Sequence, residues 1–250
     1  MKFEELDQLL RQFESLNDPV ALPGMYIVAR LDGRGFTQFT KKNNDFEKPF
    51  DPQFKENMLA TLQHLMNTGF KVTYGYTQSD ELSLLFDLKT GVYGRKIRKY
   101  TSLLAAEASA KFSLLCGQIA TFDCRIIQFP TKDWVVDYFR WRNEDAARNA
   151  LNAYCYWTMR KTGMDAQAVT AQLSTFTQAE KNELLFQAGI NYNEVPNWQK
   201  RGIGAYYHTV TKAGYNPLQQ SNTITSRLQL CIEENLPMKD AYNELLQHII

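Results

Sequence analysis

The chain has 250 residues, of which 44% are hydrophobic and 22% charged, proportions that are ordinary for a soluble globular protein. Its 28 basic and 27 acidic residues leave a net charge of +1, so the overall charge does not indicate nucleic-acid binding. No apolar run approaches the roughly 20 residues of a membrane helix, and the charged residues 1–5 do not resemble a secretory signal, so we expect a cytoplasmic protein with no membrane segment.

The first half of the chain predicts strands and helices in alternation. Four apolar residues at helical spacing predict an opening amphipathic helix: Phe3, Leu6, Leu10 and Phe13. Asp51 and Pro52 form an N-cap and a first-turn proline, which predict the start of a second helix. Short apolar runs predict strands over residues 25–31, 71–76, 82–86 and 122–129, and residues 100–116 predict a buried helix. From the first strand onward the order is β-α-β-β-α-β, which is typical of a ferredoxin-like sheet.

The second half of the chain predicts mainly helices. They are expected over residues 133–142 and 145–161, and Thr177 with Glu180 forms a capping box ahead of a helix over residues 181–187. Residues 203–210 predict a late strand, and the last 40 residues show weak helical patterns that fix no element. Because no repeat, linker or low-complexity segment divides the chain, we expect residues 1–250 to form a single compact unit. Residues 20–130 would be its α/β core, with the mainly helical residues 131–250 packed on it.

Three carboxylates fall at the ends of neighbouring strands in this predicted sheet. Asp32 follows the first strand, and Asp80 and Glu81 lie on the hairpin between the second and third strands. Polymerase palm domains and nucleotide cyclases use such an arrangement to hold two Mg²⁺ ions by oxygen ligands. The four cysteines and three histidines form no zinc-binding pattern, which leaves oxygen ligands for any metal. From these residues alone a second interpretation stays open, an ordinary turn at Asp32 and a polar hairpin tip at Asp80.

Several spaced segments carry a more specific combination of residues. They are residues 30–36 (RLDGRGF), 46–51 (FEKPFD), 76–83 (YTQSDELS), 181–186 (KNELLF) and 191–193 (NYN), together with Asp137-Tyr138, Trp141-Arg142 and Asp145. Over residues 20–212 this series resembles the tRNA-His guanylyltransferases and their relatives. The resemblance implies a polymerase palm-like fold and a nucleotidyltransferase that extends RNA at its 5′ end.

The resemblance also implies the chemistry and the metal ligands. ATP or GTP activates the 5′-monophosphate of the RNA, and the 3′-hydroxyl of an incoming nucleotide then attacks the activated phosphate, so synthesis runs in the 3′-to-5′ direction. Asp32, the Gly33 carbonyl and Asp80 would hold two Mg²⁺ ions, with Glu81 as a supporting catalytic carboxylate. Members of the family form tetramers, and one subunit offers little positive surface. We therefore expect a homotetramer that binds tRNA across its subunits.

Further residues are assigned to the substrates by the same resemblance. The expected nucleotide contacts are Asp32, Gly33, Arg34, Gly35, Phe36, Thr37, Ser79 and Asp80. Glycines have no side chain, so the backbone at Gly33 and Gly35 could approach a triphosphate. Cations that would hold the triphosphate are Lys48, Arg95, Lys96 and Lys99. Candidate RNA contacts are Arg140, Arg142, Arg148, Lys181 and Asn182, and a salt-bridged helix surface is an equal alternative for the three arginines.

One segment departs from the family's pattern. Eukaryotic members that add an extra guanosine to tRNA-His carry His-Ile-Asn-Asn where this chain has residues 147–150 (ARNA), with no histidine and only the first asparagine matched, at Asn149. The bacterial and archaeal "like" branch lacks that motif and is associated with template-dependent repair of 5′-truncated tRNA. We therefore predict repair, with tRNA-His guanylylation as the alternative. A nucleotide cyclase and a non-catalytic RNA-binding module are further alternatives. The downstream motifs argue against the cyclase, and clustered carboxylates, which repel RNA without a metal, argue against the binding module.

Overall fold

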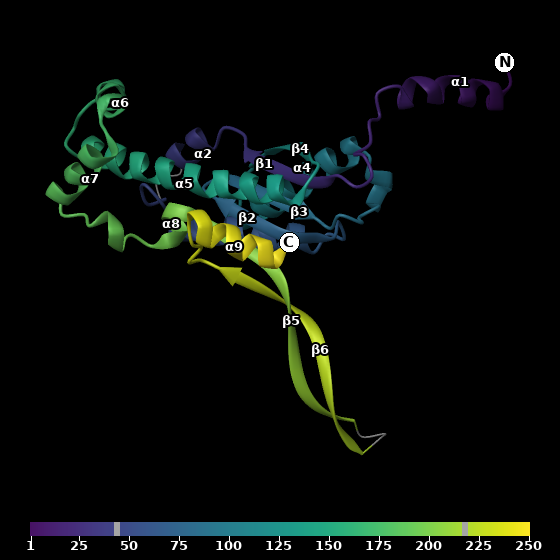
Figure 1. The fold of residues 1–250 in the computed structure, drawn as a ribbon. Helices are drawn as coiled ribbons and strands as arrows, with labels where there is room; N and C mark the ends of the chain where they lie inside the picture. The colour runs from purple at the N-terminus through teal and green to yellow at the C-terminus, as the bar shows by residue number, and fades with distance from the viewer. Residues whose placement is uncertain (43–45, 217–219) are drawn as a thin grey trace.

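The computed structural model describes residues 1–42, 46–216 and 220–250, and a six-stranded antiparallel sheet lies at its centre (Figure 1). The strand order is β4-β1-β3-β2-β5-β6. The strands are β1 (Tyr26–Gly33), β2 (Val72–Gln78), β3 (Glu81–Phe86), β4 (Phe122–Phe129), β5 (Ile203–Asn216) and β6 (Ser221–Glu233). The first four strands have the order of a ferredoxin-like sheet, so the predicted palm-like core is confirmed.

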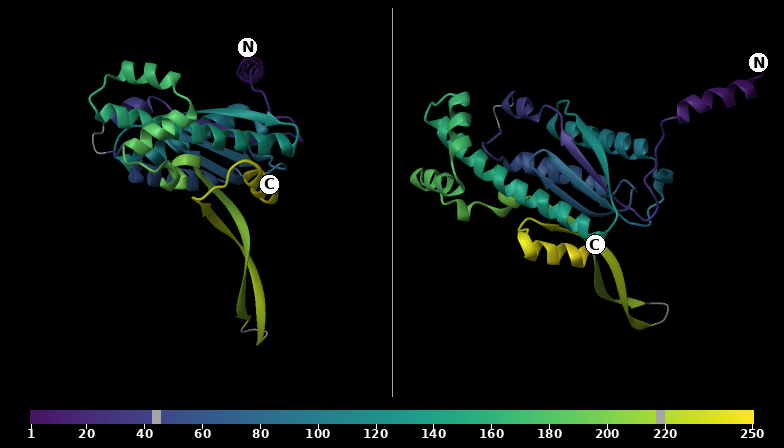
Figure 2. Two further views of the ribbon diagram at one scale, coloured as in Figure 1. Left: turned by 60° about the vertical axis from the view of Figure 1, so that its left-hand side comes forward. Right: turned by 45° about the horizontal axis from the view of Figure 1, so that its top comes forward.

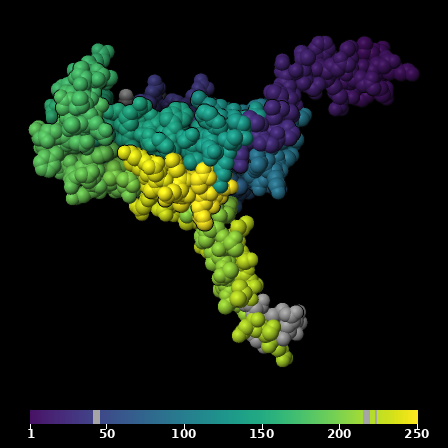
Figure 3. Space-filling view, in the orientation of Figure 1, coloured from purple at the N-terminus to yellow at the C-terminus, as the bar shows by residue number. Residues whose placement is uncertain are grey.

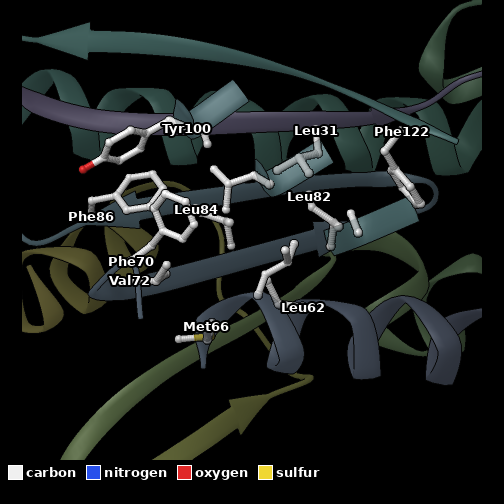
Figure 4. Close-up of a cluster of buried hydrophobic side chains, with 14 of the residues drawn as sticks. Leu31, Leu62, Met66, Phe70, Val72, Leu82, Leu84, Phe86, Tyr100 and Phe122 are labelled. Carbon is white, nitrogen blue, oxygen red and sulfur yellow. The ribbon is translucent and has the colours of Figure 1, made fainter. Parts of the chain in front are cut away.

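Helices cover both faces of the sheet. α3 (Pro52–Met66) and α4 (Ile97–Cys116) pack on one face, and Figure 4 shows the apolar side chains buried between this layer and the strands. α5 (Lys132–Lys161) and α9 (Lys239–Ile249) pack on the other face (Figure 2). Along β1, Ile27 and Ala29 belong to the first cluster and Val28 to the second. A strand covered on both faces is apolar on both, which is why residues 26–29 carry no charge.

The remaining helices lie mainly around the second half of α5. α6 (Ala166–Thr175) and α7 (Gln178–Gln187) form a third apolar cluster with it. The shorter elements are α2 (Phe36–Lys42), η1 (Val92–Arg95), η2 (Tyr192–Glu194) and α8 (Asn197–Arg201). Both predicted caps are confirmed, because Asp51 accepts a hydrogen bond from the Phe54 N–H at 2.7 Å and Thr177 pairs reciprocally with Glu180. Within the described ranges, no helix is long and apolar enough to cross a membrane.

The prediction of two helices over residues 133–142 and 145–161 is wrong, because α5 is one helix of 30 residues. Thr131 caps its start by accepting a hydrogen bond from the Trp134 N–H. Residues 132–161 contain no glycine or proline that would end it. Asn143, between the two predicted helices, is buried and donates to the Arg201 carbonyl at 3.0 Å. This contact with another element gives the buried Nδ2 group a partner in place of water, whereas the buried Oδ1 has none among the described residues.

Two elements project from the body (Figures 1 and 3). α1 (Phe3–Ser15) has no buried residue. β5 and β6 continue beyond the sheet as a two-stranded hairpin, because β5 pairs with β2 only over residues 203–206. The sequence predicted the first part of β5 and missed β6, whose residues 221–227 are mostly Ser, Thr and Asn, with only Ile224 apolar. The prediction of one compact unit did not foresee either projection.

Candidate active site

Strand pairing brings Asp32 and Asp80 together. Asp32 is the penultimate residue of β1 and lies opposite Glu81 of β3. The Gly33 N–H donates to the Asp80 carbonyl at 3.1 Å, which ties the end of β1 to the tip of the β2–β3 hairpin. Ser79 at that tip has a φ of 52°, in the left-handed region that is uncommon for a residue with a side chain. The two carboxylates thus meet at one end of the sheet, as the strand order predicted.

The environment of Asp80 disfavours a lone negative charge. Its pKa is raised to about 6, first by burial and then by the charges of Asp32 and Glu81. Hydrogen bonds from its own backbone and from Ser79 act in the opposite direction and are outweighed. A bound cation reverses this balance, because it makes the ionised carboxylate the favoured form.

The donors at this end of the sheet fit Mg²⁺. Among the described residues no group of three or more His, Cys, Asp or Glu side chains is placed to hold a metal. The site instead offers two carboxylates, Asp32 and Asp80, with the backbone of Gly33 beside them. Mg²⁺ is usually held by one or two carboxylates and completes its shell with water and substrate phosphates rather than with a full protein cage. The residues present therefore suit a metal that arrives with a nucleotide.

Glu81 is held by two arginines rather than aimed at a metal. Its Oε1 lies 2.5 Å from Arg30 Nη2 and its Oε2 lies 3.5 Å from Arg142 Nη1. Arg142 is 4% exposed and also pairs with Asp145 at 2.5 Å. Glu81 is therefore an anchor of the hairpin tip, which agrees with the supporting role that the resemblance implied.

A cavity of about 450 Å³ opens beside Asp80. It lies between the β2–β3 hairpin tip, the segment before α3, α5 and α8. Its aromatic walls are Phe36, Phe46, Phe50, Phe54, Tyr156, Trp157 and Trp198. Lys48 lines it too, with its Nζ donating to the Thr40 carbonyl at 3.0 Å and lying 5.9 Å from the ring centroid of Trp157. Aromatic faces next to a cation and a pair of carboxylates suit a nucleotide, whose base stacks and whose phosphates carry negative charge.

A second cavity of about 230 Å³ adjoins the first, and both are lined by Ser79 and Asp80. Its other walls include the Glu81–Arg142–Asp145 group and a stretch of α5 with small side chains, Ala146, Asn149, Ala150 and Ala153. Asn149 and Ala150 belong to the four-residue segment that stands in place of the family's histidine motif, and Asn149 matches the first asparagine of that motif. Of the departing positions, Ala150 therefore lies in the wall beside the carboxylates, whereas Arg148 is exposed.

Glycine is required at positions 33 and 35, after Asp32, for two different structural reasons. A Cβ on Gly33 would lie 2.4 Å from Cδ2 of Phe36, whose buried ring packs against Phe122. Packing thus requires Gly33, a reason that the sequence did not reveal. Gly35 has a φ of +72° and open space around it, so its conformation is what requires glycine. Of the other predicted nucleotide contacts here, Arg34 and Thr37 are exposed, and Thr37 lines the larger cavity.

Three of the four predicted triphosphate cations do not reach either cavity in this chain. Arg95 donates to five backbone carbonyls, those of Ala21, Leu22, Met25, Leu88 and Thr90. Lys96 pairs with Asp18 at 2.8 Å, and Lys99 lies in the first turn of α4. These residues lie near the beginning of β1, whereas Asp32 is at its end, roughly 20 Å along the strand. Arg95 therefore serves as a structural tie, and only Lys48 stands at the site.

The arginines proposed for RNA contact are engaged within α5. Arg140 pairs with Glu144 at 3.0 Å. Arg148 is exposed and pairs with Asp145. Arg142 is 4% exposed, lies between Glu81 and Asp145, and lines the second cavity. All three arginines are thus paired with carboxylates of this chain, and their contact with RNA stays a prediction.

The other two candidate RNA contacts lie on α7, apart from both cavities. Lys181 is half-buried and its carbonyl accepts a hydrogen bond from Cys155 Sγ at 3.4 Å. Asn182 is exposed and donates to the Gln178 carbonyl at 2.9 Å. Residues that the sequence did not single out are the aromatic walls from distant segments, such as Trp157 and Trp198. Nothing local in the sequence marks them, because only the fold places them beside Asp80.

Comparison with known proteins gives the same picture over nearly the whole chain. The sequence profile of tRNAHis guanylyltransferase (Thg1) matches residues 7–130, and that of the Thg1 C-terminal domain matches residues 133–241. A probable tRNA(His) guanylyltransferase of Drosophila melanogaster is 33% identical over 205 residues, covering 78% of this chain and 71% of that protein. The tRNA(His) guanylyltransferase of Debaryomyces hansenii is 30% identical over 243 residues, 91% of each chain.

Solved structures share the fold. A bacterial Thg1-like protein in complex with GTP superposes with a TM-score of 0.75 over 98% of both chains, at 23% identity. The Saccharomyces cerevisiae tRNA(His) guanylyltransferase superposes with a TM-score of 0.73 at 29% identity, covering 81% of this chain and 92% of that one. With two family profiles spanning most of its length, this chain belongs to the tRNAHis guanylyltransferase (Thg1) family of nucleotidyltransferases.

Proposed function

We propose that this protein adds nucleotides to the 5′ end of tRNA in the 3′-to-5′ direction and repairs 5′-truncated tRNAs against a template. The observation that carries the choice of repair is the wall of the second cavity. Where guanosine-adding members have a histidine motif, this chain has Ala147, Arg148, Asn149 and Ala150, and Asn149 and Ala150 lie against the carboxylates. These two side chains are small and uncharged, and they lie in the same wall as the ion-paired Glu81, Arg142 and Asp145. Without the histidine, this part of the wall selects no particular base, which suits an enzyme whose template chooses the nucleotide.

In this proposal the carboxylates would bind the metal and the larger cavity would bind the nucleotide. Asp32, Asp80 and the Gly33 carbonyl would hold Mg²⁺, which would neutralise charge on the triphosphate and lower the pKa of the attacking hydroxyl. Arg30 and Arg142 hold Glu81, and so keep the tip that carries Asp80 in place. The aromatic walls would stack on the base of ATP or GTP, and Lys48 would face its phosphates. Orientation of two substrates by such fixed groups is itself a large share of phosphoryl-transfer catalysis.

A second candidate is the addition of one guanosine to tRNA-His. The names of the curated relatives from Drosophila melanogaster and Debaryomyces hansenii favour it, and these relatives are 30 to 33% identical to this chain. It would require the chain to recognise its tRNA without the histidine motif.

Feeding both kinds of RNA to the enzyme separates the two candidates. The protein is incubated with Mg²⁺, ATP and four labelled nucleotides, and with two tRNAs lacking their first nucleotide or with intact tRNA-His. The repair proposal expects template-matched addition to the truncated tRNAs. Addition of guanosine to tRNA-His alone would overturn it in favour of the second candidate. Asp80→Asn should abolish either activity, whereas Asp240→Asn, an exposed change on α9, should not.

The proposed assembly is a homotetramer acting in the cytoplasm, with tRNA bound across subunits. It is supported by the engagement of Arg140, Arg142 and Arg148 in ion pairs, which leaves little positive surface beside the cavities of one chain. Light scattering at working concentration tests it, and a monomer would contradict it.

A further inference from the structure

We infer that α1 of one copy of this chain packs on the distal hairpin of a second copy. The hairpin surface meant here comprises residues 207–214 of β5 and 224–231 of β6. The inference rests on the proposed self-association and names the contact that builds it. It starts from two exposed apolar surfaces that the single chain leaves without cover.

The first surface is the apolar face of α1. Phe3 is 76% exposed and Phe13 is 70% exposed, and Leu6 and Leu10 lie between them on the same face. Helices of 13 residues are marginal in water unless an amphipathic face is packed. A helix that is this amphipathic and has no buried residue therefore indicates a partner.

The second surface is one face of the distal hairpin. Ile224 is 77% exposed and Leu228 is 70% exposed. They lie four residues apart on β6 and so point to the same face. Their cross-strand neighbours, Ala213 and Thr209, are small, which leaves a shallow strip between the two apolar side chains. A two-stranded ribbon is at best marginally stable in water unless a helix or a third strand packs on it.

The two surfaces match in length and charge. Phe3 and Phe13 are about 15 Å apart along a helix, and Ile224 and Leu228 are about 13 Å apart along a strand. α1 contains four acidic residues and one arginine, a net charge of −3. Residues 207–231 contain Lys212 and Arg227 and no acidic residue, a net charge of +2. By the strand register, Lys212 and Arg227 lie on the face opposite to Ile224 and Leu228. Because the ribbon is one residue thick, their charges lie within a Debye length of a helix packed on the apolar face.

The occupant that offers both complementary surfaces is another copy of this chain. α1 and the hairpin project from different sides of the body in all the views of Figures 1 to 3, so they do not meet within one chain. A second copy offers each surface the partner that it lacks. A reciprocal exchange would bury both surfaces twice per pair, as a closed symmetric assembly requires.

Cross-linking between two different variants tests the contact directly. One full-length version carries Leu10→Cys with an affinity tag, and the other carries Leu228→Cys without a tag. Mild oxidation should join them only in the mixture, giving a tagged product of twice the mass on a non-reducing gel. Gln8→Cys, on the polar face of α1, and Gln229→Cys, on the other hairpin face, are the matched controls. The unsubstituted chain measures the background from its four native cysteines.

Charge reversal separates this contact from an RNA-binding role of the hairpin. Glu4→Lys with Glu14→Lys should weaken self-association at least tenfold in analytical ultracentrifugation, and so should Lys212→Glu with Arg227→Glu. All four changes together should restore it. If the hairpin reversal leaves the assembly intact and weakens only tRNA binding, the hairpin is an RNA surface and the inference is wrong.

The outcomes also distinguish this inference from the proposed assembly. If the unsubstituted protein is a monomer, both the proposed assembly and the contact between α1 and the hairpin are wrong. An assembled protein whose two cysteine variants fail to cross-link above the controls would leave the assembly standing and overturn only this contact.

Discussion

Asp80 is a residue whose charge opposes folding until a cation arrives. Its pKa in the folded chain is about 6, against 3.8 for the ordinary side chain. Between these values the folded state binds more protons than the unfolded state, so stability falls as pH rises from about 4 to 6 and stays reduced above that. Active sites often retain such unfavourable groups because function requires them.

Replacing Asp80 by asparagine should therefore stabilise the metal-free protein while it abolishes activity. At pH 8 the gain in the free energy of unfolding should be on the order of 2 to 3 kcal/mol, and it should disappear below about pH 4. Urea denaturation in EDTA at several pH values measures it, with Asp240→Asn as the control. A destabilised Asp80→Asn protein at pH 8 would contradict the argument.

Arg142 illustrates a residue that acts through others. Its guanidinium bridges Glu81 and Asp145, and a lysine has only one nitrogen with which to reach both. Arg142→Lys should lower kcat about tenfold or more and leave the KM for ATP within about threefold, since the aromatic cavity stays intact. Steady-state kinetics against Arg140→Lys, whose ion pair is on the surface, checks this. Equal losses in both variants would show that Arg142 has no positioning role.

At the scale of elements, the turn from β1 into α2 depends on one glycine. Gly33→Ala would place a Cβ against the ring of Phe36, which is enclosed by other aromatic rings and has no room to shift. We expect a loss of about 1 to 3 kcal/mol in the free energy of unfolding and a displaced Asp32. Gly91→Ala is the matched control, because its added Cβ meets nothing and its φ is −114°. Thermal unfolding of the two variants side by side tests this.

The sequence predicted those elements whose signals are local. β4 has the predicted bounds, Asp51 caps α3, and the order of the first four strands placed Asp32 beside Asp80. The sequence did not predict elements whose bounds depend on a contact with a residue far away in the chain. The predicted helix break inside α5 was wrong, because Asn143 is buried in the helix and its Nδ2 donates to a carbonyl some 60 residues away, at Arg201.

The residues of the candidate site were likewise predictable only where a motif local in the sequence marks them. Motif residues close in sequence identified the carboxylates and Lys48, which the structure places together at one end of the sheet. The sequence did not show that Arg95 donates to backbone carbonyls of its own chain, because a cation in a basic run looks the same whether it faces phosphate or carbonyl groups. The cavity walls from α5 and α8 could be identified only from the fold. In the sequence, their aromatic residues look the same as aromatic residues of the hydrophobic core.

At the scale of the whole molecule, nucleotide binding should stabilise the fold, because the nucleotide would contact parts of the chain that are far apart in sequence. The larger cavity takes walls from α2, α3, α5, α8 and the β2–β3 hairpin. ATP with Mg²⁺ at about 100 times its dissociation constant should raise the Tm by about 5 to 10 °C, and EDTA should remove most of the shift. Trp157→Ala should reduce it, whereas Trp134→Ala, an exposed tryptophan on the same helix, should not. A shift unaffected by EDTA would contradict the proposed metal.

The uninterrupted length of α5 has a mechanical consequence. Its first part is clamped between the sheet and α9 by Val135, Val136 and Phe139, and its remainder extends to carry α6 and α7. The helix is about 45 Å long, and beyond Arg142 it is held again by α8, since Asn143 donates to the Arg201 carbonyl and Tyr154 to the Gln199 side chain. One continuous helix therefore connects the sheet, the ion pair between Arg142 and Glu81, the wall of the larger cavity and the α6–α7 cluster. A displacement of α5 caused by a bound nucleotide would reach α6 and α7 without crossing a loop.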